Sequence, residues 1–318
     1  MSEQTENPNP QKPQRIPFDL KDFYLYYSHN YFQIKRTLLQ NLLGDLNGYA
    51  GMFNENPMVS AEDLKSSLKL EIRGTYFQAI ETLFELLFAL EKQDDEEIWK
   101  ILANSGRSNY ARIESIANGD HSFFEKKIKV KPLNQSSEVE LSLLLYLVYY
   151  RFAPIELSED WNRGLETIKS FLIQIGKDFS DRIDYNAFKH GLRLFPTLRT
   201  ITFGKKEYDL SNSYTILKGK KDYDEEEKQD TNDQHKSRFR IVQFDLEHDL
   251  RMIELCGELI SNIILTRRCA YYPDEKKTFY YFNKINYDDF IVSNVKFVSF
   301  NFTVEKIFRS EDSADSNV

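Results

Sequence analysis

The sequence predicts an α+β fold that is predominantly α, a helical bundle with a small C-terminal antiparallel sheet. Up to Pro196, apolar residues recur mainly at steps of three and four, which is the spacing of one face of a helix. Beyond Pro196 come short segments rich in β-branched and aromatic residues, separated by Gly, Asn and Ser, as is typical of strands. The 12 glycines are far outnumbered by 19 tyrosines and 24 phenylalanines, which favours packed helices over a glycine-rich nucleotide-binding fold.

The first half of the chain is expected to supply most of the bundle. Residues 20–47 form the first predicted helix, which Asn47 and Gly48 end. Residues 60–93 form the longest helix, with Ser60 as its N-cap and Asp63 three positions later. Shorter helices are expected around Trp99 and over residues 110–116, with "NSG" and "NGD" as breaks.

Two more helical segments are expected before Pro196. "IKVKPLNQSSE" is interpreted as a connection, after which Ser136 or Ser137 caps an apolar helix that runs to Phe152. The stretch from Ser158 onwards is predicted to be one long helix or two abutting ones, able to bend at Gly176 and ended by Pro196.

The last third of the chain is expected to form the sheet around one further helix. Strands are predicted in "LRTITFG", "KEYDL", "SYTILKG" and "SRFRIVQFDL", a helix over residues 246–272, and strands again in "KTFYYFNKI" and "NVKFVSFNFTVEKIF". The expected organisation is a disordered leader (1–16), a helical bundle (17–196), a small sheet plus a long helix that packs back on the bundle (197–308), and a disordered acidic tail (309–318). Whether this makes one domain or two is left open.

Composition excludes several classes of function. A net charge of −8 argues against broad, nonspecific duplex binding, which depends on neutralising many phosphates, although a local basic pocket is allowed. The most apolar run, residues 141–150, has about half of the roughly 20 residues that a membrane-spanning helix needs. Cys256 and Cys269 form no CxxC motif. We therefore expect a reduced, cytoplasmic location and no membrane partner.

The common motifs of cofactor and metal chemistry are not found in the sequence. There is no GxGxxG, GxxxxGK[ST], HExxH or GxSxG, and no Cys/His cluster at zinc-ligand spacing. The five histidines are widely scattered along the chain. We therefore expect no cofactor and no metal.

One stretch, "RIDYNAFKHGLRLF", carries an unusual set of polar residues. Arg182, Asn186, His190 and Arg193 are separated by steps of four, four and three, so on a helix they would share one stripe. A merely solvated face would instead carry Glu and Lys. This polar stripe is therefore the first candidate site.

The most apolar helix contains a second polar set. Arg73 and Glu81 lie two turns apart and flank Phe77. Charged groups are rarely buried unless they are paired, so both need partners. If this helix neighbours the polar stripe, Glu81 would orient His190 or pair with Arg182. Arg73 would then join a cationic pocket of the size of a phosphate.

A helical bundle in which a polar helix carries Arg or Asn, followed within a few residues by His, resembles the HEPN superfamily. In "RIDYNAFKH", seven residues separate Arg182 from His190, more than in the family pattern. The resemblance implies metal-independent cleavage of RNA. His190 would be the general acid/base and Asn186 would orient it, while Arg182 or Arg193 would hold the phosphate. Members of the family commonly build this site across a dimer, and many have lost activity and bind RNA or proteins instead.

The functional expectation is an HEPN-like protein that binds RNA, or cleaves it without a metal, in a defence or stress context. Whether it is an enzyme is left open. The alternative is a noncatalytic protein-interaction or scaffold module with a structural polar seam, working through its aromatic first helix or its sheet edge. RNA, another protein and a second copy all remain open as partners. The aromatic stretch "YLYYSHNYF" at residues 24–32 would stack on bases or belong to the core.

Overall fold

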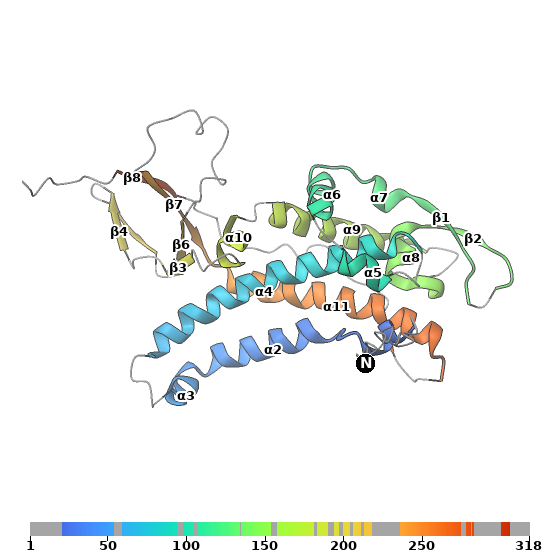
Figure 1. Ribbon diagram of the computed structural model, residues 1–318, viewed down its shortest axis with the longest axis horizontal. Helices are drawn as coiled ribbons and strands as arrows, with labels where there is room; N and C mark the ends of the chain where they lie inside the picture. Colours follow the sequence, from blue (N-terminus) through green and yellow to red (C-terminus); the bar gives the residue numbers. More distant parts are fainter. Residues whose placement is uncertain are drawn as a thin grey trace, which may run out of the picture.

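In the computed structural model of the protein, long helices form a bundle and a small antiparallel sheet lies at one end of it (Figure 1). The predicted fold class, predominantly α with a small sheet, is therefore confirmed. The structure describes residues 21–53, 59–93, 98–104, 107–133, 135–153, 158–180, 183–189, 194–196, 200–203, 206–210, 213–217, 236–274, 278–280, 282 and 300–305. The predicted leader (1–16) and tail (309–318) lie outside these residues.

Two long helices form the centre of the bundle. α4 (Ala61–Leu90) and α11 (Leu246–Tyr271) contact each other along their length, and α2 (Tyr31–Gly44) packs on both (Figure 1). α9 (Glu159–Ser180) contacts α4 and α6 (Arg107–Ala117). The remaining helical elements are short: α1 (Asp22–Tyr26), α3 (Leu46–Gly51), α5 (Ile98–Ala103), α7 (Ser122–Glu125), α8 (Leu143–Tyr149), the 3₁₀ helix η1 (Tyr150–Phe152) and α10 (Ile183–Lys189).

The predicted start and length of α4 agree with the structure. The Ser60 hydroxyl accepts a hydrogen bond from the Asp63 amide at 3.1 Å, and the Asp63 carboxylate accepts one from the Ser60 amide at 2.9 Å. This reciprocal capping box satisfies two amides that a helix start leaves free. Most α4 residues from Leu68 onwards are buried. A helix that is apolar on most sides has to lie in the middle of a bundle.

The prediction of one helix over residues 20–47 is wrong. The chain forms α1, a non-helical link at residues 27–30, α2 and α3. Asn47 and Gly48 lie inside α3 and do not end a helix. The Asp45 side chain caps the start of α3 by accepting a hydrogen bond from the Gly48 amide at 3.1 Å. The link is tied to α11 through His29, whose Nδ1 lies 3.0 Å from the Ser261 hydroxyl.

The interpretation of residues 128–138 as a plain connection is also wrong. β1 (Lys127–Val130) and β2 (Val139–Ser142) form an antiparallel pair in which Val130 faces Val139. Helix α8 starts only at Leu143, and its cap is Ser142, which accepts a hydrogen bond from the Leu145 amide at 3.3 Å, rather than Ser136 or Ser137. The strand has a two-residue alternation, with lysines exposed and apolar residues buried, that is too short to stand out.

Of the two alternatives predicted before Pro196, one long helix or two abutting ones, the structure agrees with the second, but the predicted end at Pro196 is wrong. α9 and α10 are separate helices, and α10 ends at Lys189. Leu194–Pro196 then form strand β3 at the edge of the sheet, and edge strands are where proline is tolerated in a sheet. The helix therefore does not extend to Pro196.

The sheet has four antiparallel strands in the order β3-β6-β7-β8, with a separate two-stranded ribbon beside it. Its members after β3 are β6 (Ser213–Leu217), β7 (Lys236–Gln243) and β8 (Phe300–Glu305), and the ribbon pairs β4 (Thr200–Phe203) with β5 (Lys206–Asp209). β8 follows α11 in the chain, so the sheet is completed after the last long helix, as predicted. A strand is predicted in "KTFYYFNKI". Within this segment the structure describes residues 278–280 and 282, and these are not in a strand.

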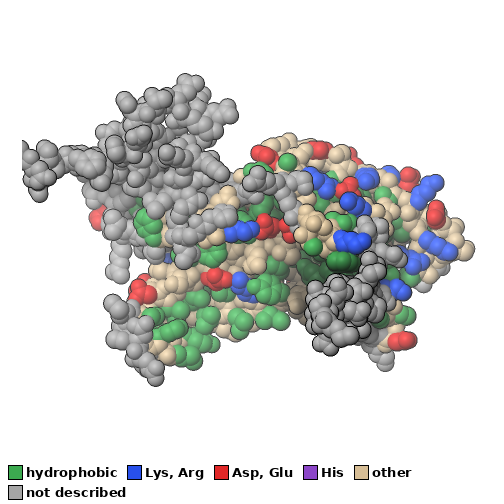
Figure 2. All heavy atoms as spheres, viewed as in Figure 1, with side chains coloured by type: hydrophobic (Ala, Val, Ile, Leu, Met, Phe, Trp, Pro, Cys, Tyr) green, Lys and Arg blue, Asp and Glu red, His purple; other side chains and the backbone are tan. Residues whose placement is uncertain are grey.

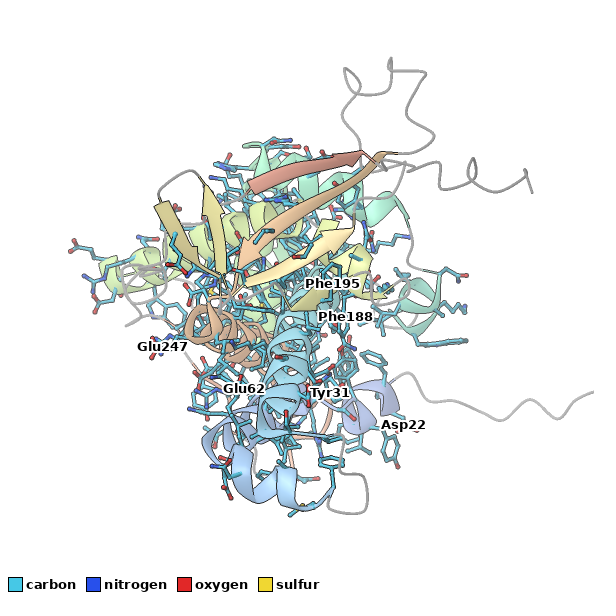
Figure 3. The ribbon with its side chains drawn as sticks, turned by 90° about the vertical axis from the view of Figure 1, so that its left-hand side faces the viewer. Asp22, Tyr31, Glu62, Phe188, Phe195 and Glu247 are labelled. Carbon is cyan, nitrogen blue, oxygen red and sulfur yellow. The ribbon has the colours of Figure 1, made fainter. Side chains whose placement is uncertain are left out.

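A second small apolar cluster joins the sheet to the bundle. Tyr214, Ile216 and Val242 from the sheet pack with Ala187 of α10. Leu70 of α4 lies against the same cluster. Figure 3 views the molecule from the sheet side and places Phe188 of α10 beside α4. None of the described helices is both long and apolar enough to cross a bilayer.

Candidate functional site

The helix that carries the predicted polar stripe lies directly on α4. The Tyr185 hydroxyl of α10 donates a hydrogen bond to Glu81 Oε2 at 2.7 Å, and Lys189 Nζ lies 3.5 Å from the same oxygen. The two helices are therefore neighbours, which is the condition that the Glu81 hypothesis required. The partners of Glu81 among the described residues are Tyr185 and Lys189.

A glycine allows this close approach of the two helices. A Cβ atom at Gly74 would lie 2.6 Å from a ring carbon of Phe188, well inside van der Waals contact. Asn186 lies on the same short helix and is partly exposed. Arg182, His190 and Arg193 lie outside the described residues, so the structure places only Asn186 of the predicted stripe, and the catalytic and phosphate-binding roles stay predictions.

Arg73 pairs with an acidic side chain that the sequence pattern did not indicate. Its Nη1 lies 2.8 Å from Asp249 Oδ1 on α11, and its guanidinium stacks over the Phe77 ring at 4.6 Å. The same Phe77 ring also stacks on Tyr185 of α10, with ring centroids 5.3 Å apart. The Asp249 carboxylate compensates the charge of Arg73 in this structure. The role of Arg73 in phosphate binding stays a prediction.

His248 shares the Asp249 carboxylate with Arg73. Its Nδ1 lies 3.5 Å from Asp249 Oδ1, which is an ion-pair distance rather than a good hydrogen bond. Burial alone would lower the pKa of His248, but the carboxylates of Asp249, Asp178 and Asp245 raise it above the ordinary histidine value. These carboxylates therefore stabilise the charged form of the imidazole relative to the neutral form.

Asp178 of α9 completes this set of buried polar groups. It accepts hydrogen bonds from the Tyr76 hydroxyl at 2.5 Å and from Gln174 Nε2 at 3.0 Å. Burial raises the pKa of the Asp178 carboxyl above its ordinary value, although the hydrogen bond from Tyr76 opposes this. We name the group formed by Arg73, Tyr76, Asp178, His248 and Asp249 the junction network, because it joins α4, α9 and α11.

The junction network has the groups for acid/base chemistry, but its charges already compensate one another. Two carboxylates face one guanidinium and one imidazole whose pKa they raise. Compensated charges of this kind are what a buried structural network requires. Sequence reasoning missed it because its members are far apart in the chain, and no local spacing connects them.

A second feature lies on the other side of the bundle, where the N-terminal helices expose apolar side chains. Six of the nine large hydrophobic side chains that are exposed among the described residues belong to α1, α2 and the end of α3. These six are Tyr26, Tyr31, Ile34, Leu38, Met52 and Phe53, and we call them the α1–α3 face. Figure 2 shows hydrophobic side chains gathered over α2 and α3.

The α1–α3 face contains a groove of about 500 Å³ at the bend between α1 and α2. Its lining includes the side chains of Tyr26, Tyr31, Ile34, Lys35, Leu38 and Arg268. The Lys35 ammonium pairs with Glu71 of α4 at 2.8 Å. The aromatic stretch at residues 24–32 is thus divided, because Tyr24 and Phe32 are buried in the core while Tyr26 and Tyr31 are exposed at the groove.

No model of a known protein family matches the chain, and no curated protein or solved structure matches it either. The function therefore has to be argued from the two features described above. The described residues contain no group of three or more His, Cys, Asp or Glu side chains placed to hold a metal ion.

The two features differ in how much apolar surface they expose, although in the junction network Asp249 Oδ2 and His248 Nδ1 are buried without a hydrogen-bond partner among the described residues. In the junction network, Arg73 and Asp178 each contact partners from another helix. On the α1–α3 face, Ile34 is 59% exposed and Leu38 is 57% exposed, so their apolar surfaces face water. The α1–α3 face is the feature that a binding partner would complete.

Proposed function

We propose that the protein is a protein-binding module and that the α1–α3 face is its binding surface. The observation that carries this proposal is the gathering of six exposed large hydrophobic side chains on neighbouring helices. Single exposed apolar residues are normal on a protein surface, whereas a contiguous patch is typical of an interaction site.

The two sides of α2 support the same proposal. Phe32 and Leu39 are buried and attach the helix to the bundle. Tyr31, Ile34 and Leu38 lie on the outward side, where the fold does not need apolar groups. A helix with a second apolar stripe is suited to contact another element on that side.

The test compares charged variants of the surface with a matched control. Leu38→Glu and Ile34→Glu change the α1–α3 face, and Trp99→Glu places the same charge at an exposed hydrophobic residue on α5. A partner captured by crosslinking in the source cells would be identified, purified and titrated against each variant. We expect both α2 variants to lose at least about tenfold in affinity while Trp99→Glu does not. Equal affinities for all four proteins would reject the proposal.

We propose an RNA-related function as the second candidate. An HEPN-like protein would bind RNA, or cleave it without a metal, in a defence or stress context, using His190 as acid/base with Asn186 and Arg182 beside it. Two observations support this candidate: α10 packs on α4, and Asn186 is partly exposed. The same site would be built across a dimer if the resemblance extends to assembly.

An RNA cleavage assay with a chelator present tests the second candidate. Wild type would be compared with His190→Ala and with His121→Ala, which removes a histidine at the start of α7, outside the predicted stripe. Cleavage that resists the chelator and is lost only in His190→Ala is the expected result. If none of the three proteins cleaves or binds RNA, the candidate fails.

A further inference from the structure

We propose that the ligand of the α1–α3 face is an amphipathic helix of another protein, with acidic residues beside its apolar stripe. This inference rests on the proposed protein-binding function and adds the chemical class of the partner. It is drawn from the shape of the surface, from the charges at the groove and from the charges on α2 itself.

The shape of the surface fits a helical ligand. Tyr31, Ile34 and Leu38 follow one another at steps of three and four, so they form a straight apolar ridge along α2. α2 has 14 residues and is therefore about 21 Å long, enough for several turns of a partner helix. The groove of about 500 Å³ that this ridge lines has room for a large apolar anchor side chain.

The charges at the groove favour an acidic ligand. Lys35 and Arg268 are among its lining residues, and none of the described lining residues is Asp or Glu. Lys35 also lies 5.7 Å from the centre of the Tyr31 ring, so its ammonium group is next to the apolar ridge. Carboxylates flanking the apolar stripe of a partner helix would meet Arg268 and Lys35, of which Lys35 also pairs with Glu71 of α4. These contacts provide orientation and specificity.

A second copy of the same α2 helix fits less well. The α2 sequence, YFQIKRTLLQNLLG, contains Lys35 and Arg36 and no Asp or Glu. Arg36 pairs with Glu254 of α11, whereas Lys35 lines the groove. Packing this helix on the groove of another copy would therefore bring Lys35 toward Lys35 and Arg268. Like charges at a contact are unfavourable, so the surface is better matched to a partner with the opposite charge.

A single-stranded nucleic acid fits less well too. Bases stack on aromatic rings, and Tyr26 and Tyr31 would serve for this. The ridge continues with the aliphatic side chains of Ile34 and Leu38, however, and these offer phosphates and base edges no hydrogen bond.

A display library of single helices tests the class of partner directly. Every member would carry Leu and Phe at helical spacing on one face, with flanking positions varied among Glu, Gln and Lys. The library would be selected on the full chain. We expect Glu to exceed Lys at the flanking positions by at least about tenfold after selection, which corresponds to about 1.4 kcal/mol. Absence of binders, or Lys at the level of Glu or above it, would overturn the proposal.

Variants of the surface locate the binding of the selected helices. Affinity should fall at least about tenfold in Leu38→Glu and in Tyr26→Ser, and remain unchanged in Trp99→Glu. All three positions are exposed, and thermal melting would verify that each variant is folded. Binding that survives both surface variants would overturn the proposal. So would a wild-type dimer, seen in sedimentation, that Leu38→Glu dissociates, because the face would then belong to a second copy.

This experiment can fail without the protein-binding function failing. If a purified cellular partner binds wild type and not Leu38→Glu, but the library shows no preference for Glu, the binding function stands and the acidic class is wrong. If neither a partner nor a library member depends on Leu38, both proposals are wrong.

Discussion

Arg73 on α4 and Asp249 on α11 form an ion pair, with 2.8 Å between Nη1 and Oδ1, across the contact of the two central helices. The Asp249 side chain is 1% exposed and that of Arg73 is 16% exposed. His248 Nδ1 lies 3.5 Å from the same carboxylate oxygen. One buried acid thus faces two basic groups, and its charge depends on them because an isolated buried charge is costly.

Removing the acid should destabilise the protein strongly. In Asp249→Ala, Arg73 and His248 lose their shared partner, and we expect the free energy of unfolding to fall by about 3 kcal/mol. Urea denaturation at neutral pH measures this. Glu71→Ala is the matched control, because it removes the acid of a more exposed ion pair with Lys35 and should cost less than about 1 kcal/mol. Equal losses in the two variants would contradict the prediction.

The junction network should also make stability depend on pH in a defined direction. The pKa of His248 is raised from 6.5, so the folded protein holds this proton more tightly than the unfolded chain does. The resulting stabilisation is fully present below pH 6.5 and is lost as the pH rises through the folded pKa. The difference in unfolding free energy between wild type and His248→Gln should therefore shrink as the pH rises from 6.5 through the folded pKa of His248.

Unfolding free energies of wild type and His248→Gln, measured in steps above and below pH 6.5, would check this window. His121→Gln serves as a control, because His121 is the partly exposed N-cap residue of α7 and lies outside the junction network. The raised pKa of Asp178 acts in the same direction at lower pH, since its contribution is present below 3.8 and is lost as the pH rises through its folded pKa. A difference between wild type and His248→Gln that grows above pH 6.5 would contradict the assignment.

The parts of the fold that the sequence predicted are those set by neighbouring residues. α4 was predicted with its cap because Ser60 and Asp63 are three residues apart and the apolar pattern follows immediately. The strands after Pro196 could be predicted for the same reason, because their pattern is also set by neighbouring residues. β1 and β2 were missed because each has only four residues, so the alternation of Ile128 and Val130 is too brief to outweigh a loop interpretation.

The candidate sites depended on distant residues, and here the sequence was less informative. Nothing local connects Arg73 with Asp249, which is 176 positions away. The exposure of Tyr31 and burial of Phe32 follow from the side on which α11 and α4 cover α2, a tertiary fact. The helical period predicts that two faces exist but leaves open which one is covered.

Gly74 should be intolerant of a side chain. Its added methyl group would lie 2.6 Å from the Phe188 ring, so α10 would have to shift away from α4. We expect Gly74→Ala to cost about 1–2 kcal/mol of unfolding free energy, because overpacking outweighs the roughly 1 kcal/mol that alanine contributes in a helix. Gly44→Ala, with no atom within 4 Å of the added carbon, should be neutral or stabilising. Recovery in Gly74→Ala with Phe188→Leu would identify the clash as the cause.

Truncating an apolar side chain should change the free energy of unfolding much more on the inward side of α2 than on the outward side. Leu39 is 5% exposed, and Leu39→Ala removes buried contacts and leaves a cavity, so we expect a loss of about 2–5 kcal/mol. Leu38, its neighbour in sequence, is 57% exposed, and Leu38→Ala should change the free energy of unfolding by less than about 0.5 kcal/mol. Denaturant unfolding of the two single variants measures both values. A large loss in Leu38→Ala would mean that this side of α2 is needed for folding, and it would remove the ground for treating the outward apolar stripe as a binding surface.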